Sequence, residues 1–177
     1  MIMKIKSPPA KLTTPKHTRA RAVDPHIVEM KKLLSVTNFS GMYRLDPIER
    51  IEIVKRGVPA GEVAKLAKSM GRPKKHIFEL LGLPRATVDR QARAKQQLSI
   101  DQGERVVGFS KLVGQVQVMV EESGDSKNFD AAKWVTDWLD RPAPALNGKR
   151  PGEYMDTAEG QEIVSGLIAK IQSGAYA

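Results

Sequence analysis

Apolar residues recur at three- and four-residue spacing along most of the chain, which is the period of an α-helix. No segment shows the alternation of apolar and polar residues that a half-buried strand requires. Glycine or proline stands at several boundaries of the pattern, as a helix end or start requires. The pattern predicts an all-α fold, a small helical bundle, with helices over residues 25–34, 46–56, 63–70, 74–81, 84–95, 101–122, 129–140 and 158–173.

The predicted helix over residues 101–122 is the longest in the chain. It places one continuous apolar stripe on a single side: Val106, Phe109, Leu112, Val113, Val116, Met119 and Val120. A stripe of this length is usually part of a core, but its near-heptad spacing is equally typical of a dimer seam. Later in the chain, Trp134 and Trp138 stand four residues apart on one helix face, which we expect to be buried.

Composition divides the chain into three parts. Residues 1–23 combine proline with lysine, threonine and arginine, and too few apolar side chains to form a core, so they are predicted to be a disordered basic arm. Residues 24–122 are predicted to form a helical DNA-binding domain, and residues 128–177 a second helical unit. Between the last two helices, the proline-containing stretch 141–156 is predicted to be an ordered loop.

The net charge of +9 is unevenly distributed. Residues 1–22 carry six basic and no acidic side chains, and residues 55–111 carry thirteen basic and five acidic ones. Residues 112–177 carry six basic and ten acidic side chains. A basic middle beside an acidic end indicates two surfaces with two partners, the first of them a polyanion such as DNA.

The residues around Gly82 fit a helix-turn-helix, in which a small residue forms the turn and apolar residues lock the two helices together. Gly82 supplies the turn, and Leu83 and Val88 are expected to face inward. Arginine in the second helix can bind guanine or phosphate, and threonine can contact either. The expected DNA contacts are therefore Arg85, Thr87, Arg90 and Arg93.

A competing register places the motif one helix earlier. It uses Gly71 as the turn and Ile77 as the locking residue, which would make Lys74, Lys75 and Phe78 the residues that contact the bases. The later register is favoured because its second helix carries more arginine, which makes bidentate contacts that lysine does not. In a compact bundle Lys74 and Lys75 could still bind the flanking phosphates.

Little in the sequence indicates an enzyme. The three histidines, His17, His26 and His76, have no metal-ligand spacing, and no pair of carboxylates stands in an apolar setting. No phosphate-binding loop is present, so we expect no catalysis and no cofactor. The chain has no cysteine, no apolar run long enough to span a membrane and no signal-peptide core, which together predict a cytoplasmic protein.

The C-terminal third contains a tryptophan-bearing helix, a proline-flanked leucine–glycine turn and a helix that ends in glycine: Trp138, Leu139, Pro144, Ala145, Leu146, Gly148, Lys149, Pro151, Thr157, Gly160, Val164, Leu167, Ile171 and Gly174. In these residues it resembles the toxin-binding domain of the Xre/ParS antitoxins. The run from Gly82 to Val107 also resembles that family's Cro-like helix-turn-helix, through Thr87, Val88, Arg90, Leu98 and Ser99. Together the two parts cover about residues 58–177.

The resemblance implies an antitoxin that neutralises a RES-domain toxin, an enzyme that consumes or transfers from NAD, by covering its active site. It also implies that the chain binds operator DNA, represses its own operon, and acts as a homodimer or in a higher assembly with the toxin. By the same analogy, the toxin contacts are Lys149, Arg150, Tyr176 and the terminal carboxylate of Ala177.

The sequence departs from the family pattern at a few positions. Asn147 stands where glycine is frequent, Gly152 and Glu153 stand where apolar residues are common, and Gln91 replaces a frequent second arginine. The alternative hypothesis is a stand-alone helix-turn-helix regulator with no toxin partner.

Overall fold

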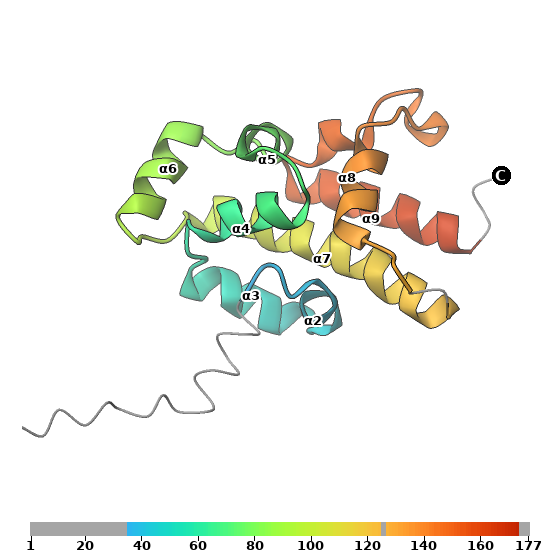
Figure 1. Ribbon diagram of the computed structural model, residues 1–177, viewed down its shortest axis with the longest axis horizontal. Coiled ribbons are helices and arrows are strands. Elements are labelled where there is room, and N and C mark those ends of the chain that lie inside the picture. The colour runs from blue at the N-terminus through green and yellow to red at the C-terminus, as the bar shows by residue number, and fades with distance from the viewer. Residues whose placement is uncertain (1–34, 125–126, 174–177) are drawn as a thin grey trace, which may run out of the picture.

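A computed structural model describes residues 35–124 and 127–173, and it consists of helices joined by short connections (Figure 1). The helices are α2 (Phe39–Arg44), α3 (Pro47–Arg56), α4 (Glu62–Ser69), α5 (Lys74–Leu80), α6 (Arg85–Arg93), α7 (Ile100–Ser123), α8 (Ala131–Leu139), the 3-10 turns η1 (Pro144–Leu146) and η2 (Pro151–Tyr154), and α9 (Ala158–Gln172). Within these ranges no strand forms, which confirms the all-α prediction. The predicted arm, residues 1–23, and the predicted helix 25–34 lie outside the described residues.

Side-chain caps fix the starts of three helices where the sequence predicts them. The carboxylate of Asp46 accepts a hydrogen bond from the Glu49 amide, and the Glu49 side chain accepts one from the Asp46 amide, at 2.9 and 3.0 Å. Ser99 forms the same kind of capping box at the start of α7, and Thr157 caps α9. These caps satisfy amide groups that have no partner inside the helix.

Helix α7 is the centre of the fold, and α2, α3, α8 and α9 all pack against it. Its stripe residues Val106, Phe109, Leu112, Val113 and Val116 are buried, and they belong to a core that runs without interruption from α3 to α9. The prediction that this stripe is core is therefore confirmed. The dimer-seam alternative is wrong for these five residues, because other helices of the same chain already cover them.

Helix α2 is not predicted by the sequence pattern, and its position depends on a glycine. A Cβ at Gly114 of α7 would overlap the carbonyl oxygen of Phe39, so only glycine allows the two helices to come this close. The hydroxyl of Ser110 donates a 2.6 Å hydrogen bond to the carbonyl of Val36 just before α2. The start of α2 is thus held against α7.

One side chain predicted to be buried is exposed. Trp134 on α8 retains 36% of its accessible surface. The core face of α8 is instead formed by smaller side chains, Ala131, Ala132, Val135, Thr136 and Leu139. Trp134 lies outside this buried face.

Among the described residues, no helix combines the length and the hydropathy that a membrane span needs.

Candidate functional site

Helices α5 and α6, with the four residues between them, form a helix-turn-helix in the later of the two predicted registers. Gly82 adopts a φ of +56°, a conformation that glycine adopts without strain. The amide of Leu83 donates to the carbonyl of Phe78 at 2.8 Å, which closes the turn. Leu83 and Val88 are buried, as predicted, so α6 is fixed against the rest of the bundle.

A side chain of α7 also holds the turn between α5 and α6. One guanidinium nitrogen of Arg105 donates to the carbonyl oxygens of both Leu81 and Gly82, at 2.8 and 2.9 Å. Arg105 itself is fixed by an ion pair with Asp101, one helical turn earlier. The long central helix therefore holds the turn from which α6 projects.

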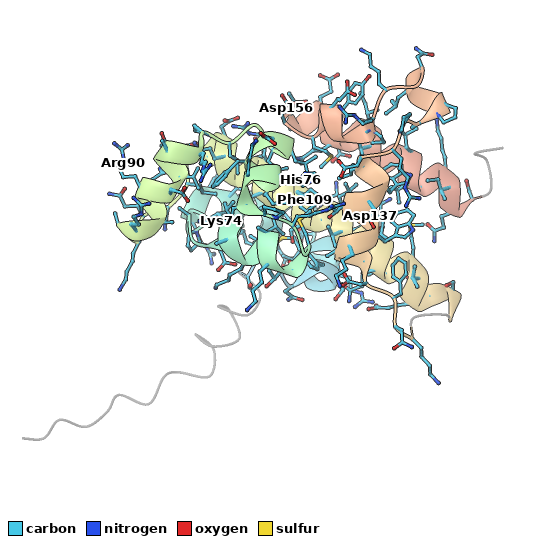
Figure 2. The ribbon with its side chains drawn as sticks, turned by 45° about the horizontal axis from the view of Figure 1, so that its top comes forward. Lys74, His76, Arg90, Phe109, Asp137 and Asp156 are labelled. Atoms are coloured by element: carbon cyan, nitrogen blue, oxygen red, sulfur yellow. The ribbon has the colours of Figure 1, made fainter. Side chains whose placement is uncertain are left out.

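The outer face of α6 is strongly basic. Arg85, Arg90 and Arg93 are exposed and Thr87 is half-buried, so the four predicted DNA contacts lie on one accessible helix. In Figure 2, Arg90 projects from α6 at the edge of the molecule. The N-terminus of α6 has no acidic residue in its first turn and no side-chain cap, which leaves its amide groups open to an anion.

An aspartate in the middle of this basic face organises two of the cations. The carboxylate of Asp89 lies 3.2 Å from the Lys74 ammonium and 3.7 Å from the Arg85 guanidinium. Lys75 instead pairs with Glu79 at 3.6 Å on its own helix. The described carboxylates leave Arg90 and Arg93 unpaired, so these two arginines are the best placed to bind a partner.

The competing register is inconsistent with the burial of its central residue. Phe78, which would contact the bases in that register, is only 4% exposed and belongs to the core. Lys74 and Lys75 are exposed at the start of α5, beside α6. They can therefore extend the basic face of α6 but do not form a separate one.

The C-terminal helices pack directly against the helix-turn-helix. Arg72, just before α5, forms ion pairs with Asp137 on α8 at 2.7 Å and with Asp140, the residue that follows α8, at 3.6 Å. The His76 imidazole lies 4.0 Å from the same Asp140 carboxylate, where α5 meets α8 (Figure 2). The two parts of the chain are thus joined by polar contacts as well as by the shared core.

Lys149 and Arg150, two of the predicted toxin contacts, are exposed in a tight loop between α8 and α9. The carbonyl of Lys149 accepts a 3.0 Å hydrogen bond from the Ala143 amide, which closes the loop. The loop bends at Asn147, whose φ of +54° is tolerated by asparagine better than by most residues and explains why it can replace a glycine here. The other two predicted contacts, Tyr176 and Ala177, lie outside the described residues.

Glu153 fixes the orientation of Arg150. The Glu153 carboxylate accepts hydrogen bonds from the amide and the guanidinium of Arg150, at 3.2 and 3.4 Å. These contacts lower the pKa of Glu153 below its ordinary value. The hydrogen bond from the Arg150 backbone is the largest cause, and the hydrogen bond from its side chain is the second. The basic pair at positions 149 and 150 therefore sits on an ordered turn.

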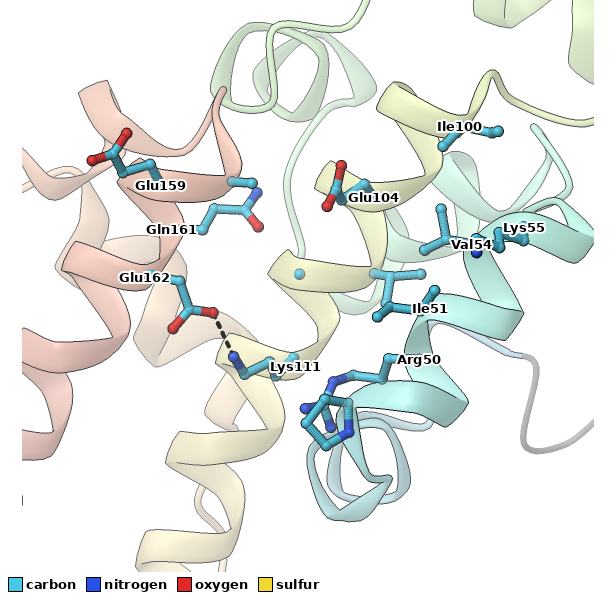
Figure 3. A pocket seen from close by; sticks show the side chains of 14 residues that line it. Arg50, Ile51, Val54, Lys55, Ile100, Glu104, Lys111, Glu159, Gln161 and Glu162 are labelled. Carbon is cyan, nitrogen blue, oxygen red and sulfur yellow. Dashed lines mark hydrogen bonds and ion pairs between the residues drawn. The ribbon is translucent and has the colours of Figure 1, made fainter.

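A groove of about 730 Å³ lies on another face, between α3, α7 and α9 (Figure 3). Its walls carry opposite charges: Arg50 and Lys55 on α3 face Glu159 and Glu162 on α9, and Lys111 forms an ion pair with Glu162 at 2.7 Å. None of the predicted site residues lines it. Sequence reasoning missed this groove because its residues are distant along the chain.

The described residues thus define a helical protein with a basic helix-turn-helix and a second helical unit that presents an ordered basic turn. Residues 49–111 match the antitoxin Xre-like helix-turn-helix domain, and residues 128–174 match the antitoxin Xre/MbcA/ParS C-terminal toxin-binding domain. The chain is 44% identical over 139 residues to the Prs ADP-ribosylating antitoxin of Sphingobium sp. (strain YBL2), across 78% of this chain and 87% of that protein. The chain belongs to the Xre/MbcA/ParS family of antitoxins.

Proposed function

We propose that this antitoxin neutralises a RES-domain toxin that consumes NAD. The observation that carries the proposal is the presence of a helix-turn-helix domain and a toxin-binding domain in one chain that is similar to a protein named as an ADP-ribosylating antitoxin. ADP-ribosylation takes its ADP-ribose from NAD, so the name of that relative fits a partner with an NAD pocket. Neither matched domain is a catalytic one, and we assign the chemistry to the toxin.

In this proposal the C-terminal part of the antitoxin covers the entrance of the toxin's NAD pocket. Lys149 and Arg150 are exposed on a turn whose geometry is fixed by Glu153, and cations there suit the negatively charged pyrophosphate position of a dinucleotide site. Tyr176 and the terminal carboxylate of Ala177 are the further contacts proposed. The active site is blocked by occupancy and needs no change in the toxin's fold.

We further propose that the chain binds its operator and represses its own operon. Arg85, Thr87, Arg90 and Arg93 on α6 would enter the major groove, and Lys74 and Lys75 on α5 would bind the flanking phosphates. Helix-turn-helix proteins commonly bind two-fold operators as dimers, so we propose a homodimer, or a higher assembly with the toxin. Binding to operator DNA places this action in the cytoplasm.

The test is co-expression with the protein encoded by the neighbouring gene. We expect that protein alone to deplete cellular NAD and arrest growth, and the two together to form a complex that restores both. Removing residues 175–177 should weaken the rescue and leave operator binding intact. No complex and no rescue, with operator binding retained, would instead support the stand-alone regulator.

A further inference from the structure

Three aromatic side chains lie together along the exposed edge of α8. The rings of Trp134 and Trp138 are nearly parallel, with an interplanar angle of 6° and centroids 6.0 Å apart. Phe129, just before the helix, lies 6.3 Å from Trp134 at a tilted angle of 48°. Phe129 and Trp138 also pack against the core, whereas Trp134 does not.

The packing of the core therefore does not require the Trp134 side chain. Its ring contacts aromatic neighbours on one side and keeps 36% of its surface exposed. The stack on Trp138 fixes the ring before any partner arrives, so little side-chain entropy remains to be lost on binding. A large, exposed and preordered tryptophan is the type of side chain that most often dominates the affinity of a protein interface.

The surface next to the aromatic cluster is concave. A hollow of about 610 Å³ lies between the end of α7 and the start of α8, and Phe129 lines it together with Phe39 and Val120. Phe129 thus belongs both to the cluster and to the wall of the hollow. The projecting ring and the adjoining hollow form one surface that a shaped partner can cover.

We propose that this surface binds the toxin, with the exposed face of Trp134 inserted into an apolar recess of the toxin. The inference rests on the proposed function and adds a second anchor, away from the loop that carries Lys149 and Arg150. Helix α8 lies within the toxin-binding domain, residues 128–174, which favours the toxin over a second copy of the chain. DNA is disfavoured because the exposed carboxylates Asp130 and Asp137 stand four residues before and three residues after Trp134, on the same side of the helix.

The first experiment measures the affinity of the full-length antitoxin for the purified toxin, the product of the neighbouring gene, by calorimetry. Trp134→Ala should weaken binding by at least about 30-fold, as expected for an interface anchor. Trp134→Phe should recover most of the affinity, because a ring remains to fill the recess. The matched control is Ile48→Ala on α3, an apolar residue that is 69% exposed outside the toxin-binding domain, and it should change affinity less than twofold.

The second experiment observes toxin binding on the wild-type chain. The chain has two tryptophans, so 5-fluorotryptophan labelling gives two fluorine resonances that the Trp134→Phe spectrum assigns. Addition of unlabelled toxin should shift the Trp134 resonance more than the Trp138 resonance, and operator DNA should shift neither.

The outcomes separate the two proposals. Suppose that the wild-type chain binds the toxin, that the affinity of Trp134→Ala lies within threefold of the wild-type affinity, and that the Trp134 resonance does not move. The inference that Trp134 anchors the toxin is then wrong, and the proposed function stands. If the wild-type chain does not bind the toxin at all, the proposed function fails and the anchor fails with it. A resonance shift that appears only on self-association of the antitoxin would assign the surface to a second copy and overturn the inference.

Discussion

The ammonium group of Lys74 lies 3.2 Å from the carboxylate of Asp89, so an ion pair joins the two helices of the helix-turn-helix on its outer face. The same carboxylate lies 3.7 Å from the guanidinium of Arg85. Asp89 keeps only 23% of its side-chain surface exposed, whereas the two cations are half exposed or more. One carboxylate therefore orients two of the proposed DNA contacts.

Asp89→Asn should show whether Asp89 affects DNA affinity by orienting Lys74 and Arg85 or only through its negative charge. Removal of a negative charge beside DNA strengthens binding to every sequence through electrostatics. If Asp89 orients Lys74 and Arg85, operator affinity should fall while affinity for unrelated DNA rises, and their ratio should drop about tenfold, or about 1.4 kcal/mol. Fluorescence anisotropy on both DNAs checks this.

The control for this experiment is Glu79→Gln, which makes the same charge change next to Lys75 but breaks an ion pair within α5 and none with α6. It should raise both affinities by a similar factor. An Asp89→Asn variant that behaves like this control would mean that the carboxylate contributes charge alone.

Arg90→Ala should weaken operator binding by about 1 to 3 kcal/mol if the side chain contacts a base. Arg90 is exposed on α6 and the described carboxylates do not neutralise it, so it is available to a guanine or a phosphate. A phosphate contact would instead weaken all DNA sequences alike and reduce the slope of affinity against salt by about one. Arg56→Ala, on α3 and paired with Glu52, should leave operator binding unchanged.

Much of the fold could be predicted from the sequence because its signals are local. Asp46, Ser99 and Thr157 mark helix starts through hydrogen bonds that span three residues, and Gly82 marks the turn through its own backbone conformation. The basic face of α6 follows from helical spacing alone. These features depend on residues that are close together along the chain.

What was missed depends on contacts between distant segments. Helix α2 has only six residues, and its packing depends on the absence of a side chain at Gly114, which lies far along the chain. The prediction that Trp134 is buried was wrong, because hydrophobicity alone does not show which residues of α8 form its buried face. Likewise, the pairing of Lys74 with Asp89 is visible only once α5 and α6 are placed side by side.

Arg150→Ala should raise the pKa of Glu153 part of the way to its ordinary value. The largest cause of the lowered pKa is the hydrogen bond from the Arg150 backbone, which the substitution keeps, and the second is the hydrogen bond from the side chain, which it removes. A carboxyl whose pKa is lowered by folding stabilises the fold above its unfolded pKa, and this contribution is lost as the pH falls through the folded pKa. The turn carrying Lys149 and Arg150 should therefore loosen in acid.

A carboxyl-carbon NMR titration of Glu153 measures this directly. Lys170→Ala, a charge removed from the far part of α9, serves as the control and should leave the Glu153 titration unchanged. An unaltered Glu153 pKa in Arg150→Ala would contradict the side-chain contact seen between these residues.

Two glycine substitutions should change stability in opposite directions. At Gly82, alanine would occupy a φ of +56°, and its Cβ would lie 2.9 Å from a guanidinium nitrogen of Arg105 and 3.0 Å from the Cβ of Asp156. The backbone strain alone lowers the free energy of unfolding by about 1 to 2 kcal/mol. Because Arg105 holds the turn, the displacement should also disturb α6 and reduce operator binding.

Gly166→Ala is the matched control, since Gly166 lies in the interior of α9 and its added Cβ would meet nothing within 4 Å. Alanine there should raise the free energy of unfolding by about 0.5 to 1 kcal/mol, because glycine loses more backbone entropy on folding. Urea unfolding of both variants measures the two effects. A Gly82→Ala variant as stable as Gly166→Ala would show that the turn relaxes freely and that Arg105 does not hold it.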